Sequence, residues 1–249
     1  MKTHAGSVVV VTGATSGIGE AAVVAFAAAG ANVFGIARRQ EALQASRARH
    51  PAVHWLQADV TNPTEVSKAL SAIIAEAGKL DVLVNNAAVF EFAPLEGSSD
   101  EMIRSQFEIN VIGLATTTRA ALPALKATRG TIINISSAAG HKPVPGGSIY
   151  GATKAAVESF TKSWALELAP AGIRVNAVAP GPTETPGFDK LPIPKEMVPV
   201  VKAQFTSQVP LGRMASADEV ARWIVAIAEP NVTWMTGHVL AIDGGMSLT

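Results

Sequence analysis

The chain contains no cysteine, which excludes disulfides, thiolate metal sites and cysteine nucleophiles. Only 16% of its 249 residues are charged and its net charge is zero, so nothing indicates a nucleic acid or an anionic membrane as a partner. The longest early apolar run, residues 8–11, is far too short for a signal-peptide core or a membrane span. We therefore expect a cytoplasmic protein with no metal site. The low charge also predicts that some apolar surface is buried between subunits.

Short β-branched runs alternate with helical patterns along the whole chain. Residues 7–12 (SVVVVT) and 32–37 (NVFGIA) are typical of strands that are covered on both faces of a parallel sheet. Further predicted strands lie at 54–58, 80–85, 129–137, 173–179 and 238–242. No linker or repeat interrupts the alternation. The sequence therefore predicts one α/β domain over residues 1–249, with a doubly wound, parallel, seven-stranded sheet (a Rossmann fold) and helices on both faces.

A glycine-rich turn joins the first predicted strand to an alanine-rich helix. Gly13, Gly17 and Gly19 lie in this turn. Glycine lets the backbone approach a pyrophosphate, and the amino terminus of the helix offers free N–H groups and the positive end of its dipole. A plain strand–helix turn would also need small residues. The position between strand and helix nevertheless favours a dinucleotide site.

The end of the second strand indicates which dinucleotide is bound. Ala37 stands where such folds usually carry an acid for the ribose 2′-hydroxyl of NAD, and Arg38 and Arg39 follow it. Two guanidinium groups without a carboxylate suit a 2′-phosphate. We therefore expect NADP(H) to be preferred, with NAD(H) possible. The alternative is that both arginines only begin a solvated helix.

Polar residues follow the next two predicted strands. Asp59, before Val60, could cap a turn or contact an adenine amino group. The segment Asn85–Ala88 could bind neighbouring backbone or a ribose, although ordinary turn chemistry would also explain it.

Tyr150, the only tyrosine, precedes Lys154 by four positions in a predicted helix, so both side chains should share one helix face. A neighbouring ammonium is expected to bring the tyrosine pKa toward neutral pH, which would allow proton transfer. Ser136 and Ser137 end the preceding strand and could hold a carbonyl oxygen beside the pair. An ordinary surface pair of tyrosine and lysine is the alternative.

Two further segments complete the predicted site. The helix predicted over 99–126 contains Asn110, a poor helix former, which indicates a local irregularity. The proline-rich stretch 180–199 is expected to form neither a helix nor a central strand. We interpret residues 183–208 as a lid. His141, Val144, Pro145, Phe188 and Leu191 are expected to line the substrate site, although His141 could be an ordinary loop histidine.

With these motifs in order, the whole chain resembles the short-chain dehydrogenase/reductase family, in its single-domain branch. The motifs are TGATSGIG at 12–19, DV at 59–60, NNAA at 85–88, NV at 110–111, ISS at 135–137, YGATK at 150–154, NAVAPG at 176–181 and IDGG at 242–245. The resemblance implies NAD(P)-dependent interconversion of a small-molecule ketone and a secondary alcohol, and its tyrosine–lysine spacing implies carbonyl rather than enoyl reduction. Ala88, where the family usually has glycine, and Thr183, where a branched apolar residue is commoner, depart from its pattern.

The resemblance also implies roles for individual residues. Tyr150 transfers the proton, Lys154 lowers its pKa and holds the nicotinamide ribose, Ser137 rather than Ser136 donates to the alkoxide, and Asn110 positions a water. The expected cofactor-binding residues are Gly13, Thr15, Ser16, Gly17, Ile18, Gly19, Arg38, Arg39, Asp59, Val60, Asn86, Ala87, Tyr150, Lys154, Pro180, Gly181, Thr183 and Thr185.

The resemblance implies a homotetramer paired through the two helices that begin at Ser99 and Tyr150. Two other functions stay open. A 3-oxoacyl-carrier-protein reductase would need basic residues to receive an acidic carrier protein. We expect Ala169–Ala171 to be the helix end near the site. Lys126 and Arg129 are then the only nearby bases, which ranks this function below reduction of a small-molecule ketone. A non-catalytic dinucleotide-binding protein is the other alternative.

Overall fold

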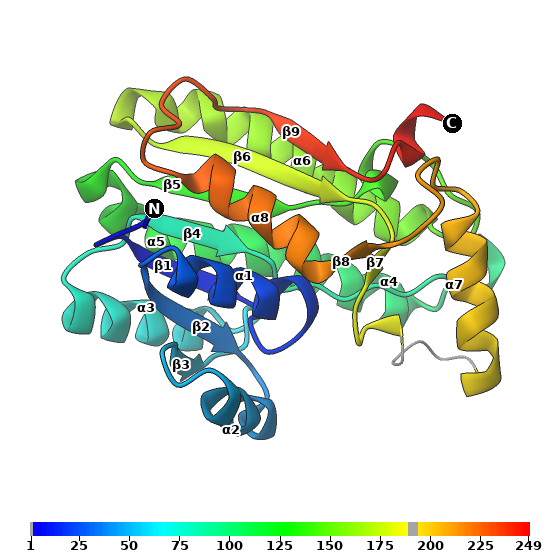
Figure 1. The fold of residues 1–249 in the computed structure, drawn as a ribbon, viewed down its shortest axis with the longest axis horizontal. Coiled ribbons are helices and arrows are strands. Elements are labelled where there is room, and N and C mark those ends of the chain that lie inside the picture. Colours follow the sequence, from blue (N-terminus) through cyan, green and yellow to red (C-terminus); the bar gives the residue numbers. More distant parts are fainter. Residues whose placement is uncertain (1, 189–193) are drawn as a thin grey trace.

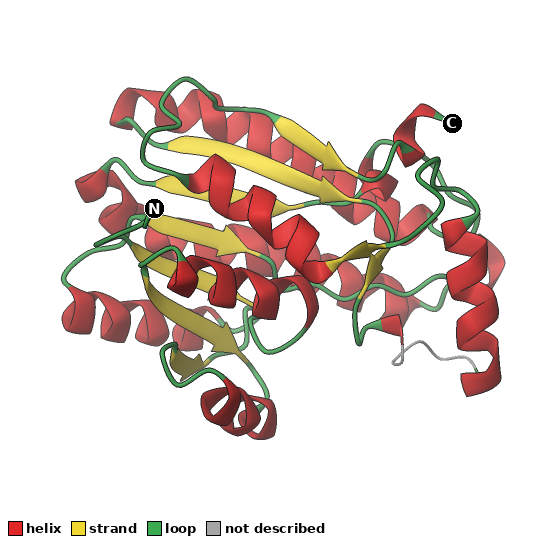
Figure 2. Ribbon diagram, viewed as in Figure 1, coloured by secondary structure: helices red, strands yellow, loops and turns green. Residues whose placement is uncertain are grey.

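A seven-stranded parallel sheet forms the centre of the computed structural model, which describes residues 2–188 and 194–249 (Figures 1 and 2). Its strands are β1 (Val8–Thr12), β2 (Asn32–Ala37), β3 (His54–Gln57), β4 (Val82–Asn85), β5 (Thr131–Ile135), β6 (Arg174–Pro180) and β9 (Val239–Ile242). They lie in the order β3-β2-β1-β4-β5-β6-β9. The predicted doubly wound sheet is confirmed, with its change of winding direction between β1 and β4.

Helices cover both faces of this sheet. They are α1 (Gly17–Ala28), α2 (Gln40–Arg49), α3 (Pro63–Ala77), α4 (Asp100–Phe107), α5 (Leu114–Thr128), α6 (Ser148–Leu168), α7 (Val198–Thr206) and α8 (Ala217–Ala228). Figure 1 shows α1 and α8 in front of the sheet, with α3, α5 and α6 behind it. Alternate residues of β1 divide the core: Val9 and Val11 pack with α1 and α8, and Val8 and Val10 with α3 and α5.

The helix predicted over 99–126 is interrupted where Asn110 indicated an irregularity. A π-helical segment, Glu108–Gly113, lies between α4 and α5. Two local contacts accompany this wider turn. The Asn110 amide bonds to the backbone of Val89 in the loop after β4, and a Cβ at Gly113 would lie 2.8 Å from Cγ2 of Val60. The irregular turn therefore lets α5 approach the carboxyl edge of the sheet closely.

The proline-rich segment after β6 contains more structure than the sequence predicted. A short strand β7 (Thr183–Glu184) pairs with β8 (Ala215–Ser216), and a 3-10 turn at Lys195–Met197 leads into α7. The expectation of no helix over 180–199 is therefore wrong at its end. Pro199 lies in the first turn of α7, where a helix does not use the missing N–H. Leu191 lies outside the described residues.

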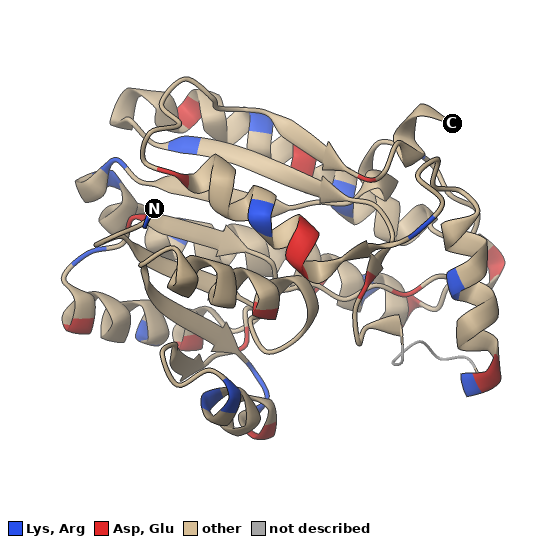
Figure 3. Cartoon of the chain, in the orientation of Figure 1, with Lys and Arg blue, Asp and Glu red and all other residues tan. Residues whose placement is uncertain are grey.

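Charge is sparse on the surface. Figure 3 shows acidic and basic residues interspersed over the helices in that view, without a gathering of one sign. Within residues 2–188 and 194–249, no helix is long and apolar enough to cross a membrane.

Candidate active site

A cavity of about 530 Å³ lies at the carboxyl ends of β1, β2, β3 and β4. Ligands of such sheets bind at this edge, outside the point where the winding reverses. Most residues expected to bind the dinucleotide line it: Gly13, Thr15, Ser16, Gly17, Ile18, Arg38, Arg39, Asp59, Val60, Asn86, Ala87 and Thr185. Gly19 does not line the cavity, because it is buried within α1 behind the turn.

The glycine turn has the close approaches that a dinucleotide site requires. Gly13 and Gly17 have φ angles of +64° and +57°, a region that favours glycine. A Cβ at Gly13 would lie 2.7 Å from the Cα of Ala87 and would push two loops apart. The cap residue of α1, Ser16, makes no side-chain cap, so the first N–H groups of this helix remain available to an anion. These residues fit a pyrophosphate.

Asn86 holds this turn to the end of β4. Its amide donates to the carbonyl oxygens of Thr12 (2.9 Å) and Gly13 (3.2 Å), and Thr12 Oγ1 accepts from the backbone N–H groups of Asn86 and Ala87. Asn85 instead points into the core, where its amide donates to Thr118 Oγ1 and Asn134 Oδ1. The side chains of Asn85 and Asn86 are therefore both hydrogen-bonded within the chain, Asn86 at the cavity and Asn85 in the core.

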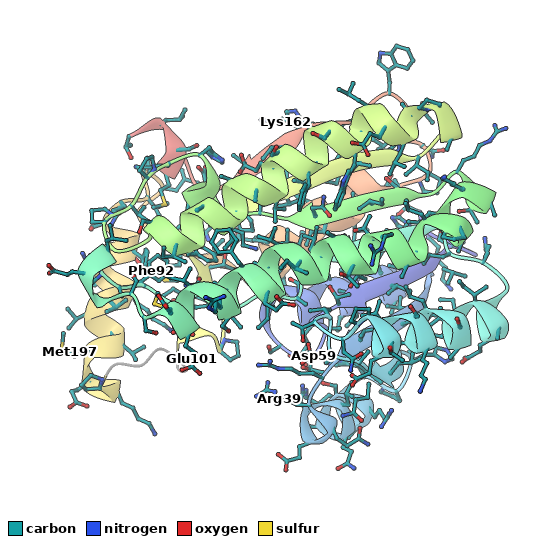
Figure 4. All side chains as sticks on the ribbon, turned by 180° about the vertical axis from the view of Figure 1, so that it is seen from behind. Arg39, Asp59, Phe92, Glu101, Lys162 and Met197 are labelled. Carbon is teal, nitrogen blue, oxygen red and sulfur yellow. The ribbon has the colours of Figure 1, made fainter. Side chains whose placement is uncertain are left out.

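The region after β2 has the charge that a 2′-phosphate needs. Ala37 is buried, and the guanidinium groups of Arg38 and Arg39 lie beside it at the cavity. Nη1 of Arg38 is 3.9 Å from Oδ2 of Asp59, and 56% of the Arg38 side chain is exposed. Figure 4 shows Arg39 and Asp59 at the same end of the molecule. Such a long, exposed ion pair restrains a side chain only weakly.

A second cavity, of about 180 Å³, adjoins the first, since Ile18, Asn86, Ala88, Phe90 and Thr185 line both. Ser137, Tyr150 and Lys154 meet in its wall, as predicted. The Ser137 hydroxyl is hydrogen-bonded to Tyr150 and accepts the backbone N–H of Ala139. Pro180, Gly181 and Thr183 also line this cavity, and Thr183 Oγ1 donates to the carbonyl oxygen of Gly181.

The pKa values of the pair differ from the expectation. Burial raises the pKa of Tyr150 to about 12, and the hydrogen bond from Ser137 opposes that rise. Burial lowers the pKa of Lys154 to about 8. Nζ of Lys154 lies 5.7 Å from the tyrosine ring centroid and donates to the carbonyl oxygen of Ile135 at 2.8 Å. The expected lowering of the tyrosine pKa is therefore wrong for this structure, because burial of the phenol outweighs the nearby ammonium.

Ser136 and Ser137 have different surroundings although they are adjacent. Ser136 is buried, and its hydroxyl donates to Oε1 of Glu158 (3.0 Å), with the carbonyl oxygen of Lys154 at 3.2 Å. Nδ1 of His141 also lies 2.9 Å from Oε1 of Glu158. Glu158 was not predicted, although its position one turn after Lys154 on the same helix face could have indicated it. His141 therefore connects the loop after β5 to α6 through Glu158, and it does not line the smaller cavity.

Asn110 lies between the loop after β4 and helix α6 and is hydrogen-bonded to both. Its Oδ1 accepts the N–H of Val89, and its Nδ2 donates to the carbonyl oxygen of Val89 and to Oγ1 of Thr153 on α6. Thr153 Oγ1 in turn donates to the carbonyl oxygen of Tyr150. Asn110 lines neither cavity, and its side chain connects the loop after β4 to α6.

Four phenylalanines, of which only Phe188 was predicted, enclose the second cavity with Val144 and Met246. Phe90 and Phe92 lie in the loop after β4, Phe188 follows β7, and Phe205 lies on α7. Pro145, also expected there, is not part of the lining. No pattern in the sequence indicates this set, because Phe90 and Phe92 lie far along the chain from Phe188 and Phe205 and no periodicity connects them.

One argument from the sequence placed its residues at the wrong edge of the sheet. Ala169–Ala171 follow α6, whose other end carries Tyr150, and Gly172 packs against the side chain of Arg129. Arg174 pairs with Thr131, the first residue of β5, so this region lies at the amino edge of the sheet. Lys126 and Arg129 therefore lie away from the site, and their number is no evidence for or against the docking of a carrier protein.

Comparison with known proteins agrees with this geometry. The family model described as enoyl-(acyl carrier protein) reductase matches residues 13–247. The chain is 37% identical over 248 residues to the 3-oxoacyl-[acyl-carrier-protein] reductase of Thermotoga maritima, covering 97% of this chain and 98% of the relative. It is 39% identical over 243 residues to cis-4-hydroxycyclohexanecarboxylate dehydrogenase of Sinomonas cyclohexanicum, and the match covers 96% of this chain and 95% of the relative.

A solved structure is similar over the same length. The 3-ketoacyl-(acyl-carrier-protein) reductase of Brucella melitensis, complexed with NADH, matches with a TM-score of 0.90 and 32% identity, covering 98% of this chain and 99% of that chain. The chain belongs to the short-chain dehydrogenase/reductase family. Its relatives in this family are NAD(P)-dependent enzymes that act on CH–OH and C=O groups.

Proposed function

We propose that this protein interconverts a small-molecule ketone and its secondary alcohol with NADP(H), and that Tyr150 transfers the proton. The observation that carries the proposal is the meeting of Ser137, Tyr150 and Lys154 in the wall of the smaller cavity, which adjoins the cavity that fits the dinucleotide. A carbonyl compound in the smaller cavity would lie beside these groups, next to the expected position of a nicotinamide. When bound, the nicotinamide supplies or accepts the hydride.

The residues of this chain then have separate roles. The Tyr150 hydroxyl donates its proton to the carbonyl oxygen during reduction and takes it back during oxidation. Ser137, already bonded to Tyr150, donates to the oxygen as negative charge develops on it. Lys154 carries the positive charge that favours the phenolate, and its pKa of about 8 keeps it partly able to exchange protons. Asn110 and Thr153 position the helix turn that bears Tyr150.

A substrate screen tests this function. NADPH oxidation would be followed with a panel of activated ketones and diones, and the same panel would be repeated with NADH. Turnover of at least one carbonyl compound, faster with NADPH, is the expected result. No turnover with any carbonyl compound and either cofactor would favour a non-catalytic dinucleotide-binding protein.

A second candidate is the reduction of 3-oxoacyl groups on a carrier protein, which the Thermotoga maritima and Brucella melitensis relatives favour. A 3-oxoacyl thioester is neutral and linear, and its carrier is a protein that must dock beside the cavity. Acetoacetyl-coenzyme A in the same screen separates the two functions. A kcat/KM for this thioester above that of every small ketone would support the second candidate.

We also propose a homotetramer in the cytoplasm, paired through α5 and α6. Leu166 on α6 is 80% exposed, and Ile112, in the π-helical segment just before α5, is 50% exposed. Figure 4 shows the two helices side by side on one face of the subunit. Apolar side chains exposed on neighbouring helices are covered when such faces pair. A monomer in sedimentation at micromolar concentration, or recovery of the native protein from a membrane fraction, would contradict these proposals.

Residues 183–208 are proposed as the lid of the site. Phe188 and Phe205, which lie toward the two ends of this segment, both line the substrate cavity. In its described part this segment forms only the two-residue strand β7, a 3-10 turn and the nine-residue helix α7, all outside the central sheet. We therefore expect its amide hydrogens to exchange faster than those of the sheet until cofactor and substrate bind. Equal protection with and without ligands would refute the lid.

A further inference from the structure

The four phenylalanines of the substrate cavity contact one another in a closed ring. Phe90 contacts Phe92 (6.1 Å between centroids) and Phe188 (6.0 Å), and Phe205 contacts Phe92 (5.7 Å) and Phe188 (5.9 Å). All four interplanar angles lie between 62° and 75°, so each ring presents its edge to a neighbour. The tyrosine ring lies against this group, 6.2 Å from Phe90 and 5.6 Å from Phe92.

This clustering is unusual for the composition of the chain. Only 5% of the residues are aromatic, yet four of the eight phenylalanines and the only tyrosine lie around this one cavity. The surrounding wall adds the apolar side chains of Val144 and Met246. A cavity with such a wall stabilises an apolar body and leaves the hydroxyl groups of Ser137 and Tyr150 to orient one polar atom.

Cations are scarce in the same cavity. Among the described residues that line it, Lys154 is the only basic side chain, and its ammonium already donates to the carbonyl oxygen of Ile135. Lys202 lies 5.6 Å from the centroid of Phe188, but its Nζ bonds to Oε2 of Glu184 at 2.8 Å. A carboxylate that entered would lose its water, and no guanidinium or ammonium of the residues described around the cavity is placed to receive it, which is costly.

The cavity is also small. Its volume of about 180 Å³ lies below the roughly 300–1,000 Å³ of pockets that hold drug-sized ligands. We infer that the substrate of this site is a compact, uncharged cyclic or aryl ketone whose ring lies among Phe90, Phe92, Phe188 and Phe205, and that the site discriminates against keto acids. The inference rests on the proposed function, because it concerns the body of the molecule whose carbonyl Tyr150 protonates.

A matched pair of substrates tests this selectivity. Cyclohexanone and 4-oxocyclohexanecarboxylate have the same ring and ketone and differ in one carboxylate. With saturating NADPH, kcat/KM for cyclohexanone should be at least about tenfold higher. Phe205→Ala should lower kcat/KM for cyclohexanone about tenfold to a hundredfold, mostly through KM, since a large apolar contact is lost. Phe205→Arg should narrow or reverse the preference, because it supplies the missing cation.

Phe160→Ala is the control variant. Phe160 stacks on Trp164 on α6, outside the cavity, with ring centroids 4.8 Å apart, so its removal should leave the ratio of the two substrates unchanged. A wild-type enzyme that used the acid as well as the ketone would overturn the inference. So would a Phe205→Ala variant with the kinetics of Phe160→Ala.

Calorimetry provides a readout that does not depend on turnover. Cyclohexanecarboxamide and cyclohexanecarboxylate have nearly the same shape and differ in charge, and the amide should bind at least about tenfold more tightly. If no carbonyl compound were reduced but the amide were still preferred, the proposed function would fail while the selectivity of the cavity held. Equal affinity, or tighter binding of the carboxylate, would overturn the inference whatever the turnover.

Discussion

The two adjoining cavities are built by different means. The larger one is made mostly of backbone, glycine and short polar side chains at the ends of β1 to β4, with two arginines at its rim. The smaller one is made of phenylalanine rings from three separate segments, and its wall contains the buried Lys154 and the half-buried Tyr150. The first suits a dinucleotide, whose pyrophosphate is bound by backbone groups. The second suits whatever molecule this protein selects, which is why the two should respond differently to substitution.

The largest effect is expected at the tyrosine in the wall of the smaller cavity. Tyr150→Phe removes one hydroxyl and leaves the ring contacts with Phe90 and Phe92 in place. Turnover should fall by at least about a hundredfold, the usual contribution of a positioned proton donor. Cofactor affinity and melting temperature should stay close to those of the wild type. Steady-state kinetics measures the turnover, calorimetry with NADPH measures the cofactor affinity, and thermal unfolding measures the melting temperature. Near-full activity of the variant would disprove the assignment.

The second prediction concerns the larger cavity alone. Arg38→Ala should weaken NADPH binding by about tenfold to somewhat over a hundredfold, because a charge-assisted bond to a phosphate is worth about 1.5–3 kcal/mol. NADH affinity should stay nearly unchanged, and so should the KM of the ketone at saturating cofactor. Arg49→Ala is the control, since Arg49 lies at the other end of α2 and pairs with Glu20. Wild-type dissociation constants for NADPH and NADH within about threefold of each other would contradict the NADP preference.

The difference between the cavities also explains what could be predicted from the sequence. The glycine turn, the arginines after β2 and the tyrosine–lysine pair are local patterns, whose geometry is set by a strand end or by one helix turn. The π-helical segment at Asn110 was indicated by one unfavourable residue. The phenylalanine ring and the partnership of Ser136, His141 and Glu158 depend on contacts between distant segments, and only the folded chain brings these together. The pKa of Tyr150 was predicted in the wrong direction because burial could not be known.

The third prediction concerns the cost of the buried lysine. The pKa of Lys154 falls from its ordinary value of 10.5 to about 8, so burying the ammonium costs about 3 kcal/mol of folding stability below pH 8. Lys154→Met removes this cost but loses the bond to Ile135, worth about 1 kcal/mol. The variant should therefore be more stable at pH 7 by about 2 kcal/mol. Lys154, a residue of the proposed active site, would then lower the free energy of unfolding of the wild-type protein.

The pH dependence gives this third prediction its sign. Between pH 8 and 10.5 the lysine of the folded protein is neutral while the lysine of the unfolded chain still holds its proton. Wild-type stability should therefore rise with pH over this range relative to the variant, and the advantage of methionine should disappear near pH 10.5. Urea unfolding of the cofactor-free protein at several pH values measures the difference. Lys162→Met, an exposed position on the same helix (Figure 4), should change little at any pH. A gap between wild type and Lys154→Met that is independent of pH would contradict the buried charge.

The smallest effect is expected at the acid that partners Arg38. The carboxylate of Asp59 lies 3.9 Å from Arg38 and should compete with a 2′-phosphate for it, and an exposed pair of this kind is worth about 0.2–1 kcal/mol. Asp59→Asn keeps an oxygen that can accept from the N–H and the hydroxyl of Thr61, so the turn after β3 should survive. NADPH should then bind about two- to fivefold more tightly, with NADH unchanged. In the Arg38→Ala background the gain should vanish, since the two substitutions act on one contact. Equal weakening of both cofactors by Asp59→Asn would instead assign Asp59 to the adenine, which both cofactors share.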